Sequence, residues 1–207
     1  MKPWLFDILA CPIDKFYPLK LYIFSYETKV KDFSDILEIY QKRDVQKISS
    51  EKIVKISKSN NKYYIKDNII IEKSIDSKYF ELLLSSINEL NHIIDKSNNE
   101  ISKKCLNLIL NEVKTNILEF VKKIDMDKIE KILPELYFVN KIKTEIEIES
   151  GLIFCEKCKR WYPIVETIPQ MLPDEYRDEN KEIEILKTNK NLLGDEFLKQ
   201  SLKPFNI

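Results

Sequence analysis

The sequence is poor in two residues that catalytic and nucleotide-binding sites commonly need, glycine and histidine. It has two glycines, Gly151 and Gly194, and one histidine, His92, among 207 residues. Isolated glycines argue against the glycine-rich turn that holds a nucleotide or S-adenosylmethionine. His92 falls on the polar side of a predicted helix, where a solvated residue is expected rather than a base that activates a nucleophile. We therefore expect no catalytic residues and a protein that is not an enzyme.

A long apolar run and a net charge are also missing. No stretch of about 18 apolar residues occurs, so no transmembrane helix is predicted. The apolar segment Met1 to Ile13 includes Asp7 and lacks the small-residue cleavage site of a signal peptide. Basic and acidic residues balance at 34 each, whereas a dedicated nucleic-acid binder usually has a basic excess. We expect a cytoplasmic protein with no membrane partner.

The N-terminal part is predicted to contain a short helix and a strand. Pro3 suits the first turn of a helix over Trp4 to Ala10. Apolar residues then alternate from Leu19 to Ser25, which predicts a strand that is covered on both sides.

The middle of the chain is predicted to be mainly helical, with one β-hairpin. Ile53 to Ile56 and Tyr63 to Ile71 flank the polar turn Lys58 to Lys62, which indicates the hairpin. An apolar stripe from Phe80 to Ile94 predicts a long helix with Asp76 or Ser77 as its N-cap. Further predicted elements are a turn at Ser97-Asn98-Asn99, a long helix from Leu106 to Ile124 and a short helix from Asp127 to Leu133 that ends near Pro134.

The last third is predicted to be a set of short strands followed by a polar segment. Isoleucines alternate with glutamates from Thr144 to Glu149, which predicts a half-buried strand. Ser150-Gly151 resembles a turn, after which Leu152 to Phe154 would run back toward Cys155. Arg160 to Val165 predicts another strand that ends at Ile168-Pro169, and Tyr176 to Lys190 predicts a solvated helix before a loosely held tail.

These elements predict an α+β protein with a discontinuous domain. Residues 1–27 and 142–175 would form a small antiparallel, zinc-ribbon-like sheet built from both chain ends. Residues 28–141 would be a large, mainly helical insertion with one β-hairpin. Residues 176–207 would be a C-terminal helix and tail that packs on one of the insertion helices or trails.

The cysteines point to a metal site. Cys155-x-x-Cys158 lies between two strands, and its spacing lets two thiolates reach one ion from a tight turn. Cys11 lies in a similar place, with Asp14 three residues on, and a carboxylate is an admissible fourth zinc ligand. The alternatives are that no metal binds, or that Cys11 forms a disulfide with Cys155 or Cys158. Cys105 lies beside an apolar helix stripe and is expected in the core.

Two segments resemble the tRNA-methyltransferase activator family. They are Leu5 to Pro12, LFDILACP, and Gly151 to Leu172, GLIFCEKCKRWYPIVETIPQML. Members of that family are small zinc-ribbon-like subunits that hold class I methyltransferases in a soluble, active form. Cys11, Cys155 and Cys158 match three of the family's four zinc positions, and Asp14 stands where zinc-bearing members have a fourth cysteine. Some members have lost the metal.

The resemblance implies a non-catalytic activating and stabilising subunit. Its partners would be class I methyltransferases, bound as a heterodimer, that modify tRNA, ribosomal RNA or a translation factor. Structural zinc is the implied cofactor, and RNA would be reached only indirectly through the partner.

The resemblance also implies that an edge strand of the ribbon pairs with the methyltransferase sheet while apolar side chains cover a patch on the partner. Interfaces favour large aromatics and methionine. About half of the candidates are expected at the interface, because such a small ribbon also needs a core of its own. The candidate residues are Leu5, Leu9, Trp161, Ile164, Ile168, Met171 and Leu172.

Two other functions fit the residues less well. A zinc-ribbon nucleic-acid-binding factor would use Lys157, Lys159 and Arg160, although four glutamates lie close to them in the sequence. An enzyme with a reactive thiolate at Cys155 or Cys158 would need an unliganded cysteine with a lowered pKa.

Overall fold

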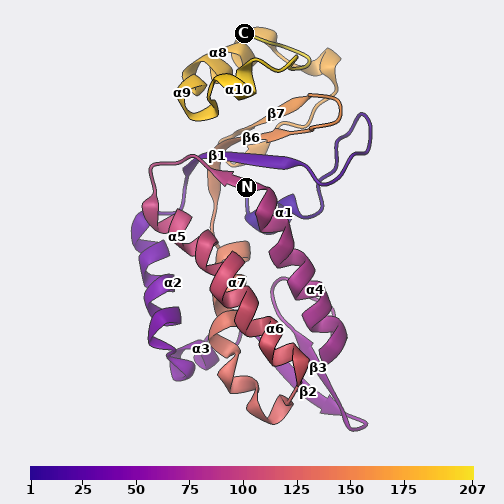
Figure 1. Ribbon diagram of the computed structural model, residues 1–207, viewed down its shortest axis with the longest axis vertical. Helices are drawn as coiled ribbons and strands as arrows, with labels where there is room; N and C mark the ends of the chain where they lie inside the picture. The colour runs from indigo at the N-terminus through magenta and orange to yellow at the C-terminus, as the bar shows by residue number, and fades with distance from the viewer. The chain divides into compact units, whose positions relative to one another are not determined.

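The computed structural model describes residues 1–207, which divide into two compact units. The ribbon unit comprises Met1–Thr28, His92–Glu100 and Glu147–Ile207, and the insertion unit comprises Lys29–Asn91 and Ile101–Ile146. Both units combine helices and strands (Figure 1), so the predicted α+β class is confirmed. None of the helices combines the length and apolarity needed to cross a membrane.

The ribbon unit is built on one mixed sheet. Its strands are β1 (Lys20–Tyr26), β5 (Ile93–Asp95), β6 (Ile148–Phe154), β7 (Trp161–Val165) and β8 (Ile168–Pro169), and their order in the sheet is β5-β1-β6-β7-β8. All neighbours are antiparallel except β5, which runs parallel to β1. The sequence predicts that residues 92–100 belong to the insertion. They belong to the ribbon unit, where Ile93–Asp95 forms an edge strand.

Gly151 lies inside strand β6, and the predicted turn at Ser150-Gly151 is wrong. It pairs with Ile23 on one side and Ile164 on the other. A Cβ atom at this position would come within 2.5 Å of the Tyr22 carbonyl oxygen. Glycine is therefore required for close approach of the backbones, not for a reversal of the chain.

The segment before β6 also differs from the prediction. Pro134 was expected to end a helix, but it lies in the first turn of helix α7 (Leu133–Thr144), where its missing N–H costs nothing. Most of α7 is buried, including Leu136 to Asn140. The predicted strand from Thr144 is wrong, because the isoleucine–glutamate alternation spans the end of this helix and the start of β6.

Two hydrophobic clusters pack within the ribbon unit. The first contains residues of the N-terminal segment, including Phe6, together with strand residues such as Leu21 and Ile153. The second joins the sheet to the C-terminal segment through Leu186, Leu193, Phe197 and Leu202, all buried against strand residues such as Phe154 and Trp161. The helices of that segment are η4 (Asp174–Tyr176), α8 (Glu179–Thr188), α9 (Lys190–Leu193) and α10 (Asp195–Leu198).

The C-terminal segment is therefore part of the ribbon fold. The expectations of a loosely held tail, or of packing on an insertion helix, are wrong, because four of its apolar side chains complete a core of the sheet. The N-terminal helix is shorter than predicted, with α1 spanning Pro3–Phe6.

The insertion unit is mainly helical and carries the predicted β-hairpin. Asn60 and Asn61 form its tip with positive φ angles of 51° and 58°, which suits a two-residue hairpin turn. Its elements are α2 (Val30–Lys42), α3 (Val45–Ser50), β2 (Lys55–Ser59), β3 (Lys62–Lys66), β4 (Ser74–Ile75), α4 (Asp76–Glu89), α5 (Glu100–Leu108), the π-helix η2 (Ile109–Val113), α6 (Lys114–Lys122), η3 (Met126–Lys131) and α7.

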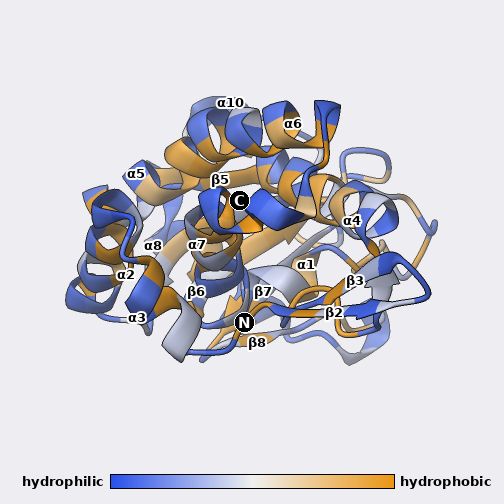
Figure 2. Ribbon diagram, turned by 90° about the horizontal axis from the view of Figure 1, so that it is seen from below, coloured by the Kyte–Doolittle hydropathy of each residue, from blue (hydrophilic) through white to orange (hydrophobic).

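The predicted long helices are present with changed ends. Helix α4 stops at Glu89, so Ile94 lies in β5, and its N-cap is Ile75 rather than Asp76 or Ser77. His92 ends a short 3-10 helix, η1 (Leu90–His92), and is half-buried. Helices α2, α4 and α6 each have a hydrophobic and a hydrophilic side (Figure 2), and Cys105 on α5 is fully buried, as predicted for a core residue.

Candidate metal centre and partner surface

Two turns of the ribbon unit have the same construction. In the first, the Cys11 N–H donates to the Phe16 carbonyl at 3.0 Å and the Lys15 N–H donates to the Cys11 carbonyl at 2.9 Å. In the second, Cys155, Lys159 and Arg160 repeat these two bonds at 2.8 and 2.9 Å. Lys15 and Lys159 both adopt a positive φ, 57° and 62°. Asp14 therefore occupies the position in the first turn that Cys158 occupies in the second.

The two turns bring four possible ligand atoms together. The Cys11 and Cys158 sulfurs lie 3.6 Å apart, the Cys155 sulfur lies 3.7 Å from Asp14 Oδ1, and all four ligand atoms lie within 4.8 Å of one another. A tetrahedral zinc binds thiolates at about 2.3 Å, which places two sulfur ligands about 3.8 Å apart. The residues present therefore fit a zinc ion.

A disulfide does not form within this cluster. All four cysteines of the chain are free thiols, and the 3.6 Å between Cys11 and Cys158 is far longer than a bonded S–S distance of about 2.05 Å. The alternative pairing of Cys11 with Cys155 or Cys158 is thus not found in the structure.

The ionisable groups of the cluster differ in their tendency to lose a proton. Burial raises the pKa of the Cys155 thiol to about 12. Burial also acts to raise the pKa of Cys158, but hydrogen bonds led by the one from the Arg160 N–H outweigh it and the pKa is lowered. For Asp14, hydrogen bonds from Cys11 and the Phe16 N–H likewise outweigh burial and lower the carboxyl pKa. A divalent cation would favour the deprotonated form of all four groups.

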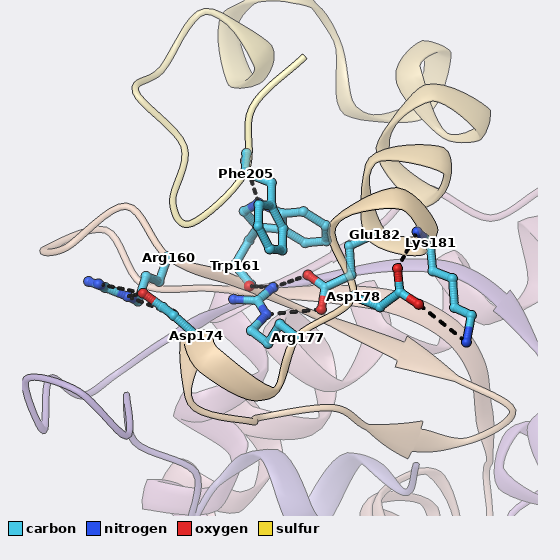
Figure 3. A network of polar contacts seen from close by, with 8 residues as sticks. All are labelled: Arg160, Trp161, Asp174, Arg177, Asp178, Lys181, Glu182 and Phe205. Atoms are coloured by element: carbon cyan, nitrogen blue, oxygen red, sulfur yellow. Dashed lines mark hydrogen bonds and ion pairs between the residues drawn. The ribbon is translucent and has the colours of Figure 1, made fainter.

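Side chains around the cluster contact both turns. The Tyr162 hydroxyl lies 3.6 Å from the Cys11 sulfur, and burial raises the pKa of this tyrosine. Arg160 donates from Nε and Nη2 to the Asp174 carboxylate at 3.1 and 2.8 Å (Figure 3). Such outer contacts orient metal ligands and fix the loop that bears them.

A second polar network joins the C-terminal segment to strand β7 (Figure 3). The Trp161 indole N–H donates to the Phe205 carbonyl at 3.1 Å, and Arg177 Nη2 donates to the Trp161 carbonyl at 2.7 Å. The Arg177 guanidinium pairs with Glu182 and lies 5.3 Å from the centre of the Trp161 ring system. Trp161 is consequently covered by this chain's own C-terminal segment.

Two of the seven predicted partner-binding residues lie in the cores instead. Trp161 and Ile164 are 0% and 2% exposed, because one packs under the C-terminal helices and the other in the first cluster. Neither side chain is therefore accessible at the surface of the chain.

The other predicted partner-binding residues are partly or well exposed. Leu5, Leu9 and Met171 are partly buried against the first cluster, while Ile168 and Leu172 are 58% and 42% exposed. Trp4, Ile8, Ile13 and Tyr17 are further exposed apolar residues, which the sequence prediction did not include. Ile8 lies in a turn beyond the end of α1 at Phe6, so a helical spacing would not have identified it.

Strand β8 ends the ribbon sheet on the side of Ile168. It pairs only with β7, so its outer edge has no strand neighbour. Pro169 lacks an N–H, which limits what this edge can donate.

Comparison with known proteins gives one finding. A family model described as "Trm112p-like protein" matches residues 2–166 of this chain. No curated protein and no solved structure matches it. The matched range includes both cysteine turns and ends before the C-terminal helices.

Proposed function

Because this chain belongs to the Trm112p-like family, we propose that it activates and stabilises S-adenosylmethionine-dependent methyltransferases as the non-catalytic subunit of a heterodimer. The observation that carries this proposal is the family match over residues 2–166, which spans both halves of the ribbon unit. The substrates of these partners would be tRNA, ribosomal RNA or a translation factor, and the complex would work in the cytoplasm.

The metal in this proposal is a structural zinc ion. Its ligands would be Cys11, Asp14, Cys155 and Cys158, whose ligand atoms already lie within 4.8 Å of one another. When bound, zinc would cross-link two turns that lie about 140 residues apart in the sequence. The chain's own contribution is to hold both turns in the same backbone geometry, so that the ligand atoms meet without rearrangement.

Partner binding would use the edge of the ribbon sheet and the apolar residues near it. Leu5, Leu9, Ile168, Met171 and Leu172 remain the proposed contacts, and the exposed Trp4 and Ile8 of the N-terminal segment extend them. Unpaired strand edges accept another strand. A methyltransferase with an exposed apolar patch would be stabilised by mass action if only its folded form binds.

The alternative functions are less well supported by the contacts. A nucleic-acid-binding ribbon would need free cations, but Arg160 is held by Asp174 and Lys20 by Glu156. A thiolate enzyme would need an unliganded nucleophilic cysteine, but burial raises the pKa of Cys155 to about 12, and Cys158, whose pKa is lowered, would be a ligand of the proposed zinc ion.

The test is a pull-down with tagged chain from native-source extract, with bound proteins identified by mass spectrometry. We expect a methyltransferase of the S-adenosylmethionine-dependent class in near-stoichiometric amount. The double variant Ile168→Asp, Leu172→Asp should reduce its capture at least about tenfold, because charges would face an apolar patch.

A matched control places the same two substitutions on the insertion unit. Ile71→Asp, Leu118→Asp changes residues that are 75% and 41% exposed, and it should leave capture unchanged. Capture of no methyltransferase, both from extract and on co-expression with candidate methyltransferases, would overturn the proposal.

A further inference from the structure

The hairpin of the insertion unit has one face rich in lysine. Its register places Lys55 opposite Lys66 and Ser59 opposite Lys62, and alternation along each strand puts these residues on the same face as Tyr64. Strand β4 continues this face, because Ile75 lies opposite Tyr64 and Lys73 places its Nζ atom 5.1 Å from the centre of the Tyr64 ring. We define the basic face as Lys55, Lys62, Tyr64, Lys66 and Lys73.

The basic face is directed away from the core of the insertion unit. Ile65, on the opposite face of β3, is fully buried, and helix α4 packs against that strand. All four lysines of the basic face are exposed and Tyr64 is half-buried. The hairpin extends beyond the helices of its unit (Figure 1), and its tip is hydrophilic (Figure 2).

The lysines of the basic face are not neutralised by neighbouring carboxylates. On helix α2, Lys31 and Lys42 pair with Asp35 and Glu38, whereas no lysine of the basic face takes part in an ion pair. Residues 52–73 contain six lysines and two carboxylates, and one of these, Asp67, is buried. The result is a local positive field on a chain without net charge.

We propose that the basic face binds single-stranded RNA. Its lysines would contact successive phosphates, and the Tyr64 ring would stack on a base that takes the place of the Lys73 ammonium over the ring. Sheet faces that combine aromatic rings with cationic side chains are suited to unpaired nucleotides, because every base offers a flat surface for stacking.

The dimensions of the basic face fit this ligand. Lys62 and Lys66 are four residues apart on one strand, which separates their Cα atoms by about 13 Å, while neighbouring strands lie about 4.8 Å apart. The lysines thus surround Tyr64 on several sides, so that a base stacked on the ring has phosphates within reach of cations on both sides. Ser57 and Ser59 add hydroxyl groups to the same face.

The choice of RNA rests on the proposed function, since the partner methyltransferases modify RNA or a translation factor. A direct contact by the hairpin departs from the expectation that RNA is reached only through the partner. It also favours an RNA substrate for the heterodimer over a protein substrate. The basic face lies outside the ribbon unit, so the two proposals can fail separately.

The first measurement is fluorescence anisotropy of a labelled single-stranded RNA of about 12 nucleotides, titrated with the full chain. Four phosphate contacts predict that affinity falls about 50-fold between roughly 50 and 200 mM salt. The variant Lys55→Gln, Lys62→Gln, Lys66→Gln, Lys73→Gln should lose most of the binding and most of this salt dependence.

The matched control removes four exposed lysines from the C-terminal segment. Lys187→Gln, Lys190→Gln, Lys199→Gln, Lys203→Gln changes the net charge by the same amount and should retain RNA binding. All eight side chains are exposed, so both variants should fold.

A second pair of variants tests stacking without changing charge. Tyr64→Leu should weaken RNA binding about 5- to 150-fold, whereas Tyr64→Phe, which keeps the ring, should bind like the parent chain. Equal loss in both variants would mean that the ring is not a stacking platform.

Three outcomes would overturn the proposal. They are the absence of RNA binding at low salt, equal RNA binding by the parent chain and the hairpin variant, and a loss of RNA binding in the C-terminal control variant as large as in the hairpin variant. Hairpin-dependent binding of phosphatidylserine-containing vesicles without RNA binding would assign the face to a membrane surface instead. The hairpin variant should capture methyltransferases as well as the parent chain does. If neither the parent chain nor any variant captures a methyltransferase, that result would count against the proposed function alone.

Discussion

Two carboxylates, one in each unit, have opposite surroundings although neither lies freely on the surface. Asp67 of the insertion unit is 6% exposed and has its acceptor sites filled by the protein. Its donors are the N–H groups of Ile69 at 2.9 Å and Ile70 at 2.6 Å, the Tyr79 hydroxyl at 2.6 Å and the Asn140 amide at 2.8 Å. A carboxylate offers about four acceptor positions, so none is left for a further ligand.

Asp14 of the ribbon unit has acceptor positions to spare. It accepts one backbone N–H, from Phe16 at 3.1 Å, and its other hydrogen-bond donors are the thiols of Cys11 and Cys155. Thiols are weak donors, so Asp14 retains lone pairs that point into a group of sulfur atoms. The two carboxylates therefore differ in their hydrogen-bond partners as well as in burial, and only Asp14 is left able to bind a metal.

The largest expected effect is loss of the proposed zinc ion from the cluster that contains Asp14. Cys158→Ser removes one thiolate, and we expect zinc to fall from one ion per chain to nearly none by elemental analysis. The ribbon unit should lose about 5 kcal/mol or more of stability, because the proposed ion would link its two turns. Hydrogen exchange should report this in β6 and β7 but not in the insertion unit.

Cys105→Ala is the matched control for that variant. Cys105 is fully buried in the insertion unit, so its removal should leave the zinc content unchanged. Full zinc content in Cys158→Ser, or hydrogen exchange in the ribbon strands that does not respond to a chelator, would contradict the assignment.

Replacing Asp67 and Asp14 by asparagine, one at a time, tests the comparison between these two carboxylates directly. Asp67→Asn should destabilise the insertion unit by about 2–4 kcal/mol in urea unfolding with or without zinc, because an amide N–H₂ would face donors such as Asn140. Asp14→Asn should leave metal-free stability nearly unchanged and weaken zinc binding in competition with a chromophoric chelator. Equal zinc affinity in parent and Asp14→Asn would show that Asp14 is not a ligand.

The smallest effect concerns a third carboxylate, Asp174, whose partner is a cation. The hydrogen-bonded Arg160 guanidinium holds the pKa of Asp174 below its usual value of 3.8. A lowered pKa in the folded state stabilises the fold above about pH 4, and this stabilisation is lost as pH falls through the folded pKa.

Unfolding measured between about pH 5 and pH 2.5 should reveal this contribution. Because solvent reaches both partners, Asp174→Asn should lower the free energy of unfolding at neutral pH by only about 0.5–1 kcal/mol. The loss of stability between about pH 5 and pH 2.5 should become smaller by the same amount. If the variant loses as much stability at low pH as the parent chain does, other carboxylates cause the pH dependence.

Local patterns in the sequence predicted the parts of the site that depend on short stretches of chain. The Cys155-x-x-Cys158 spacing indicated a ligand-bearing turn, and Asp14 was recognised at the matching place after Cys11. Strands β1 and β7 and the hairpin were predicted for the same reason, because alternation and turn residues act over a few positions.

Predictions failed where distant segments determine the environment of a residue. Gly151 resembles a turn, but the approach of β1 to β6 explains it. Trp161 resembles an interface residue, but the C-terminal segment covers it through Phe205 and Arg177. No pattern around residues 93–95 indicated a strand parallel to β1, since parallel pairing depends on a segment about 70 residues away.

Residue identity and short-range spacing were enough to indicate the candidate ligands, the two turns that carry them and the family to which the chain belongs. The meeting of Asp14 with the three cysteines, the exposure of particular apolar side chains and the grouping of lysines on the basic face could be read only from the folded chain. Burial and charge clustering arise when segments far apart in the chain pack together, and local backbone preferences do not encode which segments will meet.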